Sequence, residues 1–123
     1  MRLMDRAGFS HGVRLFNAAE FYEAHEVWED VWRPMTASKE KKFLQGLIQI
    51  AVGLHHHSTG NKVGALSLLR RGGRNVRECA ERAPGIDVDE FLAQVSAWRE
   101  ALIAGSSLPP SPRIGKRQDD IFV

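Results

Sequence analysis

Apolar side chains recur every three to four residues along most of this chain, and no stretch alternates convincingly between apolar and polar positions. The first pattern gathers apolar side chains on one face of a helix, whereas the second would indicate a half-buried strand. The sequence therefore predicts helices near residues 10–16, 17–33, 38–60, 61–82 and 87–105. Because several connections are short, we expect an all-α fold, a compact antiparallel helical bundle of about five helices.

Polar caps and helix breakers mark the ends of these predicted helices. Asn17 is typical of an N-cap, with Glu20 three residues later as its capping-box partner. Phe16 and Phe21 flank this cap at the spacing of a hydrophobic staple. Pro34 ends the helix that follows. The other boundaries carry the same classes of residue, with Ser38, Asn61 and Asp87 as N-caps and Gly60 and Gly105 as stops.

The helix predicted over residues 38–60 is apolar around more than half of its circumference, and Gly46 and Gly53 occupy the opposite side. Such a helix is typical of the centre of a closely packed bundle. We expect a single helical domain over residues 1–105 and an irregular, Pro-rich C-terminal tail over residues 106–123. The tail ends in three apolar residues, which we expect to dock on the body or on another subunit of a homo-oligomer.

Composition and charge exclude several classes of protein. Of the 123 residues, 43% are hydrophobic and 26% charged, as in an ordinary globular domain. No apolar run could span a membrane, and the N-terminus has no apolar signal-peptide core. A formal charge of +2 does not favour a nucleic-acid partner. The single cysteine, Cys79, allows no internal disulfide, which favours a cytoplasmic location, and its helical spacing with Leu68 and Val76 favours a place in the core.

One polar group stands out within an aromatic face. The spacing of residues 21–33 sets His25 on the same helical face as Trp28 and Trp32, with Glu29 at the edge of that face. Since an unpaired buried imidazole is costly, His25 needs a hydrogen-bond partner or a metal. A polar stripe on the predicted central helix could supply partners, and it consists of Gln45, Gln49 and His56.

Three hypotheses remain open for this predicted buried cluster of His25, Glu29, Gln45, Gln49 and His56. It is a structural hydrogen-bond network, a metal site, or a pocket for a small polar ligand. In a metal site, His25, Glu29 and His56 would bind a divalent ion such as zinc, iron or manganese, and Glu26 would be a general base. In a ligand pocket, Gln45, Gln49 and Trp32 would contact the ligand. The alternative function is a non-enzymatic structural or interaction module.

Known catalytic motifs do not decide between these hypotheses. In the helical zinc proteases, Glu29 would have to be a second histidine four residues after His25. The Glu-x-x-His pairs of di-iron bundles do not occur, and neither do a nucleophile elbow, a phosphate loop or a dinucleotide fingerprint. Whether the protein is an enzyme therefore stays open.

Arg70, Arg74 and Arg77 form a basic ridge along the helix predicted over residues 61–82. Nucleic acid would be one partner for it. No aromatic residues interleave with these arginines, however, so we expect pairing with the acidic side of the helix over 17–33, or plain solvation. The acidic residues concerned are Glu23, Glu26 and Asp30.

The order of several short motifs resembles one known family. The motifs are Phe16-Asn17, His25-Glu26, Glu29, Trp32-Arg33, Leu44-Gln45-Gly46-Leu47-Ile48-Gln49, His56, and Gly60-Asn61 with Gly64. Over about residues 16–69 the chain resembles the domain of unknown function 309 family of small helical bacterial and archaeal proteins. That family usually has a glycine where this chain has Ala18 and Ala19. The resemblance implies a compact all-α bundle, and it supplies no activity or substrate.

Overall fold

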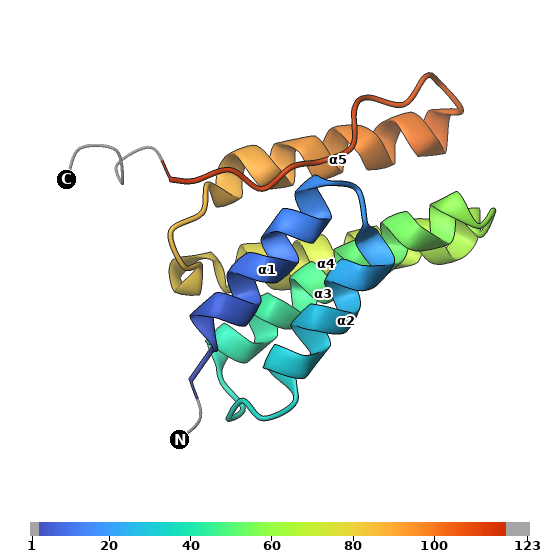
Figure 1. Ribbon diagram of the computed structural model, residues 1–123. Coiled ribbons are helices and arrows are strands. Elements are labelled where there is room, and N and C mark those ends of the chain that lie inside the picture. The colour runs from blue at the N-terminus through green and yellow to red at the C-terminus, as the bar shows by residue number, and fades with distance from the viewer. Residues whose placement is uncertain (1–2, 118–123) are drawn as a thin grey trace.

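The protein is described by a computed structural model that covers residues 3–117. Its elements, in order, are α1 (Arg6–Asn17), α2 (Phe21–Trp32), α3 (Lys39–Ser58), α4 (Lys62–Glu78), the short 3-10 helix η1 (Ala80–Arg82) and α5 (Val88–Ala104). Residues 3–117 contain no strand, only one isolated bridge between Ile86 and Lys116. The all-α helical bundle predicted from the sequence is confirmed (Figure 1).

The helices pack mainly against their neighbours in the sequence, with α3 and α4 forming the most extensive pair. α2 packs against both α1 and α3, and α5 packs on α4. Figure 1 shows α5 lying across one end of the bundle, with the chain after it turning back along the same helix. The central position expected for the helix over residues 38–60 is confirmed, because Leu44, Leu47 and Ile50 are fully buried.

Most of the predicted caps are confirmed. The side chains of Ser38, Asn61 and Asp87 each accept a hydrogen bond from the backbone N–H three residues on, and Gly105 ends α5 in the left-handed conformation. The helix over 61–82 is shorter than predicted, since α4 ends at Glu78 and a separate 3-10 turn follows.

The first helix boundary was predicted wrongly. α1 begins at Arg6, capped by Asp5, and Asn17 is its last residue rather than the N-cap of α2. Glu20 takes the N-cap position of α2 without a side-chain hydrogen bond. The aromatic contact predicted across this junction does form, since the rings of Phe16 and Phe21 meet edge to face at 5.1 Å.

The turn between α1 and α2 contains one residue with an unusual backbone conformation. Ala19 has a φ of 61°, the only non-glycine residue with a positive φ among residues 3–117. This left-handed conformation brings the Cβ atom of an L-residue too close to its own backbone, whereas glycine has no Cβ. The chain therefore holds an alanine where the backbone favours glycine.

Glycines allow α3 and α4 to approach at backbone distance. A Cβ atom on Gly46 would lie 2.8 Å from the carbonyl oxygen of Gly72, and one on Gly72 would lie 2.7 Å from that of Gly46. Gly53 similarly faces Ala65 and Leu69 of α4. The side of α3 that carries its glycines is therefore packed against α4 and does not face away from the core.

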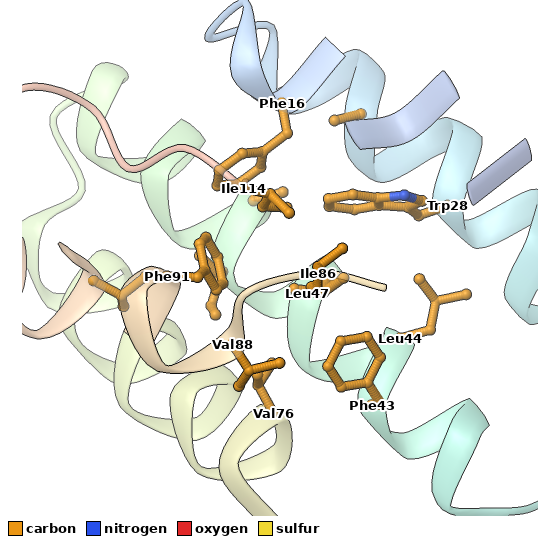
Figure 2. Packing of buried hydrophobic residues seen from close by; sticks show 14 of the residues in the cluster. Phe16, Trp28, Phe43, Leu44, Leu47, Val76, Ile86, Val88, Phe91 and Ile114 are labelled. Atoms are coloured by element: carbon orange, nitrogen blue, oxygen red, sulfur yellow. The ribbon is translucent and has the colours of Figure 1, made fainter. Parts of the chain in front are cut away.

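The core extends beyond the helices into the C-terminal tail. Phe16, Trp28 and Phe91 are fully or almost fully buried, and Ile114 of the tail, only 5% exposed, points in among them (Figure 2). Pro112 is also fully buried. Residues 106–115 contain no regular structure, but the buried side chains of Pro112 and Ile114 anchor this segment on the bundle. The predicted division at residue 105 stays a prediction, and the terminal apolar residues 121–123 lie outside the described part of the chain.

Candidate functional site: the predicted polar face and an arginine-lined pocket

His25 finds its partners on its own helix. Its Nδ1 lies 2.6 Å from the carbonyl oxygen of Tyr22, so Nδ1 is the nitrogen that donates, and Nε2 lies 3.9 Å from an oxygen of Glu29. The His25 side chain is 16% exposed. The ring of Tyr22 contacts His25 at 5.0 Å and His55 of α3 at 5.1 Å. Tyr22 therefore contacts both His25 of α2 and His55 of α3. The hydrogen-bond contact predicted between His25 and Gln45 or Gln49 is not found in the described residues.

The predicted stripe on α3 is divided between different surroundings. Gln45 is exposed, and Gln49 accepts a hydrogen bond of 2.8 Å from Asn75 of α4. His56 is half-buried, and its backbone carbonyl accepts bonds from the Thr59 hydroxyl and the Asn61 N–H at the end of the helix. Because α3 turns its glycines toward α4, Gln49 lies on that side as well.

The predicted buried cluster is not found in the described part of the chain. No polar or charged side chain among residues 3–117 is buried. Within the same residues, no group of three or more histidine, cysteine, aspartate or glutamate side chains is placed to hold a metal ion. Glu26, predicted as a general base, is exposed on α2. The individual roles assigned to His25, Glu29 and His56 stay predictions.

Trp32 keeps one unusual feature at the other end of this face. Its indole N–H is buried and has no hydrogen-bond partner within residues 3–117. The ammonium group of Lys41 lies 4.2 Å from the ring centroid, a cation–π contact between α3 and α2. A buried, unpaired donor is costly, so it is a point at which a ligand acceptor would gain.

The arginine ridge of α4 faces α5 and forms one wall of a pocket of about 340 Å³. The ridge residues Arg70, Arg74 and Arg77 are joined there by Arg99 from α5. The remaining lining residues are Leu69, Gly73, Glu78, Leu92, Val95 and Ser96. Leu69, Leu92 and Val95 belong to the buried core, so they provide an apolar floor under four guanidinium groups.

None of the pocket arginines has a carboxylate within ion-pair distance in the described residues. Glu78, the one acidic residue of the lining, is held 2.7 Å from Lys42 of α3. The hydrogen bond and charge of Lys42 lower the pKa of Glu78, with a smaller contribution from Arg74, and the same contact raises the pKa of Lys42. The pocket is thus strongly cationic, and its one carboxylate is engaged elsewhere.

Of the two arrangements expected for this ridge, pairing with the acidic side of α2 is not found among the described residues, whereas plain solvation stays a prediction. Asp30 and Glu29 pair with Arg33 of their own helix, at 2.8 and 3.4 Å. α4 packs on α3 and α5 rather than on α2, which places the ridge away from those carboxylates. Sequence reasoning also missed Arg99, although its helical spacing from Leu92 and Val95 indicates the same side of α5.

Cys79 lies where its spacing predicted, in the core. The thiol is free and 2% exposed, and burial raises its pKa. A buried thiol with a raised pKa is a poor nucleophile at neutral pH. Cys79 therefore has no part in the candidate site.

Comparison with known proteins confirms the resemblance. Residues 9–68 match the family described as "Domain of unknown function (DUF309)". The chain is 26% identical over 99 residues to an uncharacterized protein of Aquifex aeolicus (strain VF5), an alignment that covers 80% of this chain and 28% of that protein. It is 33% identical over 64 residues to the uncharacterized protein YpuF of Bacillus subtilis (strain 168), which covers 52% of this chain and 37% of YpuF.

The aligned region is thus about a third of each curated relative. The family match ends before the arginine ridge begins at Arg70, so it includes the α2–α3 face but not the α4–α5 pocket. No helix within residues 3–117 is both long enough and apolar enough to cross a membrane.

Proposed function

Taking this chain as a protein of the DUF309 type, we propose that it is a binding module whose α4–α5 pocket takes a small ligand carrying phosphate groups. The observation that carries the proposal is the convergence of four arginines on one pocket with no carboxylate partner among the described residues. The volume of the α4–α5 pocket, about 340 Å³, is in the range of small-molecule sites.

Electrostatic cost supports a ligand rather than a structural role for these arginines. Arg70 and Arg74 are four residues apart and Arg74 and Arg77 three apart, so each pair places like charges on one helix face. Such pairs destabilise a helix by about 0.2–0.5 kcal/mol each. A bound anion would remove this repulsion, and the planar guanidinium fork matches phosphate oxygens in a bidentate way.

The shape of the pocket favours a phosphorylated small molecule over a nucleic-acid strand. Leu69, Leu92 and Val95 offer an apolar floor, on which an aliphatic or planar part of the ligand would lie. The lining has no aromatic side chain on which bases could stack, the usual device of single-strand binders. Ser96 adds a hydroxyl donor next to Arg99.

Calorimetric titration with inorganic pyrophosphate and tripolyphosphate, at low and at moderate salt, tests the proposal. We expect saturable binding, and Arg74→Gln should weaken it about tenfold, the loss of one charge-assisted contact. Arg71→Gln is the matched control, because Arg71 is adjacent on α4, equally charged and absent from the pocket lining. The control should retain affinity within about twofold.

Two results would contradict this assignment. Equal weakening by the Arg71 and Arg74 variants would mean diffuse attraction without a site. Tighter binding of a mixed-sequence single-stranded oligonucleotide than of tripolyphosphate, with affinity rising with strand length, would point to nucleic acid instead.

A small polar ligand at the α2–α3 face is a second candidate function, supported by the unpaired indole N–H of Trp32. The metal version, with His25, Glu29 and His56 as ligands, is tested by metal analysis of protein purified without a histidine tag. Less than about a tenth of an equivalent, with no tight binding on titration, would remove it. If the face binds a small polar ligand, Trp32→Phe should lower the affinity for that ligand, because it removes the indole N–H and keeps an aromatic ring in the same place.

A further inference from the structure

The tail over residues 112–117 is bound to the bundle as an extended peptide would be. The side-chain amide of Asn17 holds both backbone groups of Ile114, accepting from its N–H at 2.7 Å and donating to its carbonyl at 2.9 Å. Gln94 does the same to Arg113, at 2.8 and 3.2 Å. Paired contacts of this type are the backbone recognition used in peptide-binding grooves.

Two further contacts extend the clamp along the loop before α5. The Asp87 N–H donates to the Gly115 carbonyl at 2.9 Å, and the Arg117 N–H donates to the Gly85 carbonyl at 2.9 Å. They enclose the antiparallel bridge between Ile86 and Lys116. Ile114 is the apolar anchor of the segment, inserted beside Phe16 and Phe91 (Figure 2). We call this site, formed by Asn17, Gln94 and residues 85–87 around that anchor, the tail groove.

The connector that leads to the groove is held far less tightly. Residues 105–111 are exposed except for a half-buried Pro109. The backbone hydrogen bonds in this stretch lie at its start, where Gly105 and Ser106 donate to Leu102 and Ala101. Pro109 and Pro110 are consecutive and favour an extended conformation. The tail can therefore leave its groove by a change in the connector alone, without unwinding a helix.

We propose that two copies of this chain exchange their tails, each placing residues 112–117 in the tail groove of the other. A second copy is the occupant that fits, because it offers the same anchor and the same backbone partners that the groove already binds. An empty groove would leave Phe16 and Phe91 uncovered, so a displaced tail must be replaced. Exchange restores every contact and alters only the connector, which is the general basis of domain swapping.

Shortening the connector provides the first test. Removal of Leu108, Pro109 and Pro110 shortens the connector by three residues, which strains the return of the tail along its own α5 and favours its placement in a neighbouring copy. Light scattering should then show twice the monomer mass. The matched control is the same deletion combined with Ile114→Asp, which should be monomeric. A shortened chain that is folded and monomeric, with a protease-sensitive tail, would overturn the proposal.

Cysteine cross-linking provides a second test that does not depend on the deletion. Ile86 and Lys116 form a non-hydrogen-bonded antiparallel pair, in which Cα atoms lie about 4.5 Å apart, within disulfide range. Chains with Ile86→Cys and chains with Lys116→Cys, both also carrying Cys79→Ala, are unfolded together at high concentration, refolded and oxidised.

Exchange predicts a disulfide-linked heterodimer as the main cross-linked product of this mixture. In the control, the Lys116→Cys chain is mixed with a chain carrying Glu23→Cys, an exposed position on α2, and little heterodimer should form. Equal yields in both mixtures would mean random collision and would overturn the proposal. A single chain carrying both cysteines should cross-link internally when refolded dilute.

Discussion

The two faces of α4 are built on opposite principles. Its inner face meets α3 so closely that Gly72 lies against the backbone of Gly46. Its outer face carries the next residue, Gly73, and opens onto the arginine-lined pocket. A Cβ atom added at Gly73 would have no atom within 4 Å. Two adjacent glycines thus serve different purposes, one making room for a helix and the other leaving room beside a pocket.

This difference shows that the neighbours of a residue type, and not the type alone, decide what it does. Both glycines cost helix stability in the same way, because each adds backbone entropy to the unfolded chain. Only Gly72 offsets that cost, because its lack of a side chain lets α4 pack closely against α3. Similarly, the arginines beside Gly73 would be ordinary surface charge if carboxylates paired with them, and no such ion pair occurs in the described residues.

Gly72→Ala should have the largest effect. The new Cβ would meet the Gly46 carbonyl at 2.7 Å and Ile50 at 2.8 Å, and the backbone oxygen cannot move aside cheaply. We expect a loss of about 2 kcal/mol or more, the usual cost of overpacking. Urea unfolding followed by circular dichroism measures it. An unchanged midpoint would mean that the α3–α4 contact is looser than described.

Ala19→Gly should produce a gain. The positive φ of Ala19 destabilises the folded chain by about 1–2 kcal/mol. Glycine would remove this strain, but its greater backbone entropy in the unfolded chain would offset part of the gain. A net stabilisation of roughly 0.5–1 kcal/mol is expected from the same unfolding experiment. Ala18→Gly, at a residue with a negative φ, is the control and should not stabilise.

Gly73→Ala should give a similar or smaller gain. Nothing obstructs the added methyl group, and alanine is favoured over glycine within a helix by roughly 0.5–1 kcal/mol. Opposite signs for Gly72→Ala and Gly73→Ala would confirm the contrast between the two faces. If both variants were destabilised, α4 would be packed on both sides and the pocket would be closed.

The smallest effect should come from the ion pair between Lys42 and Glu78 at the edge of the pocket. Because the folded-state pKa of Glu78 is lowered, the contribution of this pair is present at neutral pH and is lost as the pH falls through that lowered value. Both side chains are about half exposed, so the change should be slight. Wild-type protein should lose slightly more stability on acidification than Glu78→Gln. Glu23→Gln, without such a pair, should follow the wild type.

The sequence predicts the helices well because caps and apolar spacing act locally. Ser38, Asn61 and Asp87 bind backbone groups three residues away, and such contacts need no knowledge of the fold. Asn17 shows the limit of this reasoning. It has the local character of a cap, but its side chain binds the backbone of Ile114, which is 97 residues distant.

The candidate site was predicted less well, for a related reason. Helical periodicity places Gln49 on one face of α3, but it cannot say whether α2 or α4 covers that face. The glycines decide it, since Gly46 and Gly53 bring α4 onto that side and Asn75 then becomes the partner of Gln49. The arginine ridge was seen in the sequence, whereas its fourth member, Arg99, joins it only through the packing of α5.

The position of Cys79 gives the protein an internal reporter. The thiolate is the form that attacks thiol reagents, so this side chain is shielded in two ways, by its neighbours and by its raised pKa. It lies at the joint between α4 and η1, and reagents can reach it only when that joint opens. The rate at which Cys79 is chemically labelled therefore reports local opening of the segment between α4 and η1, without any introduced probe.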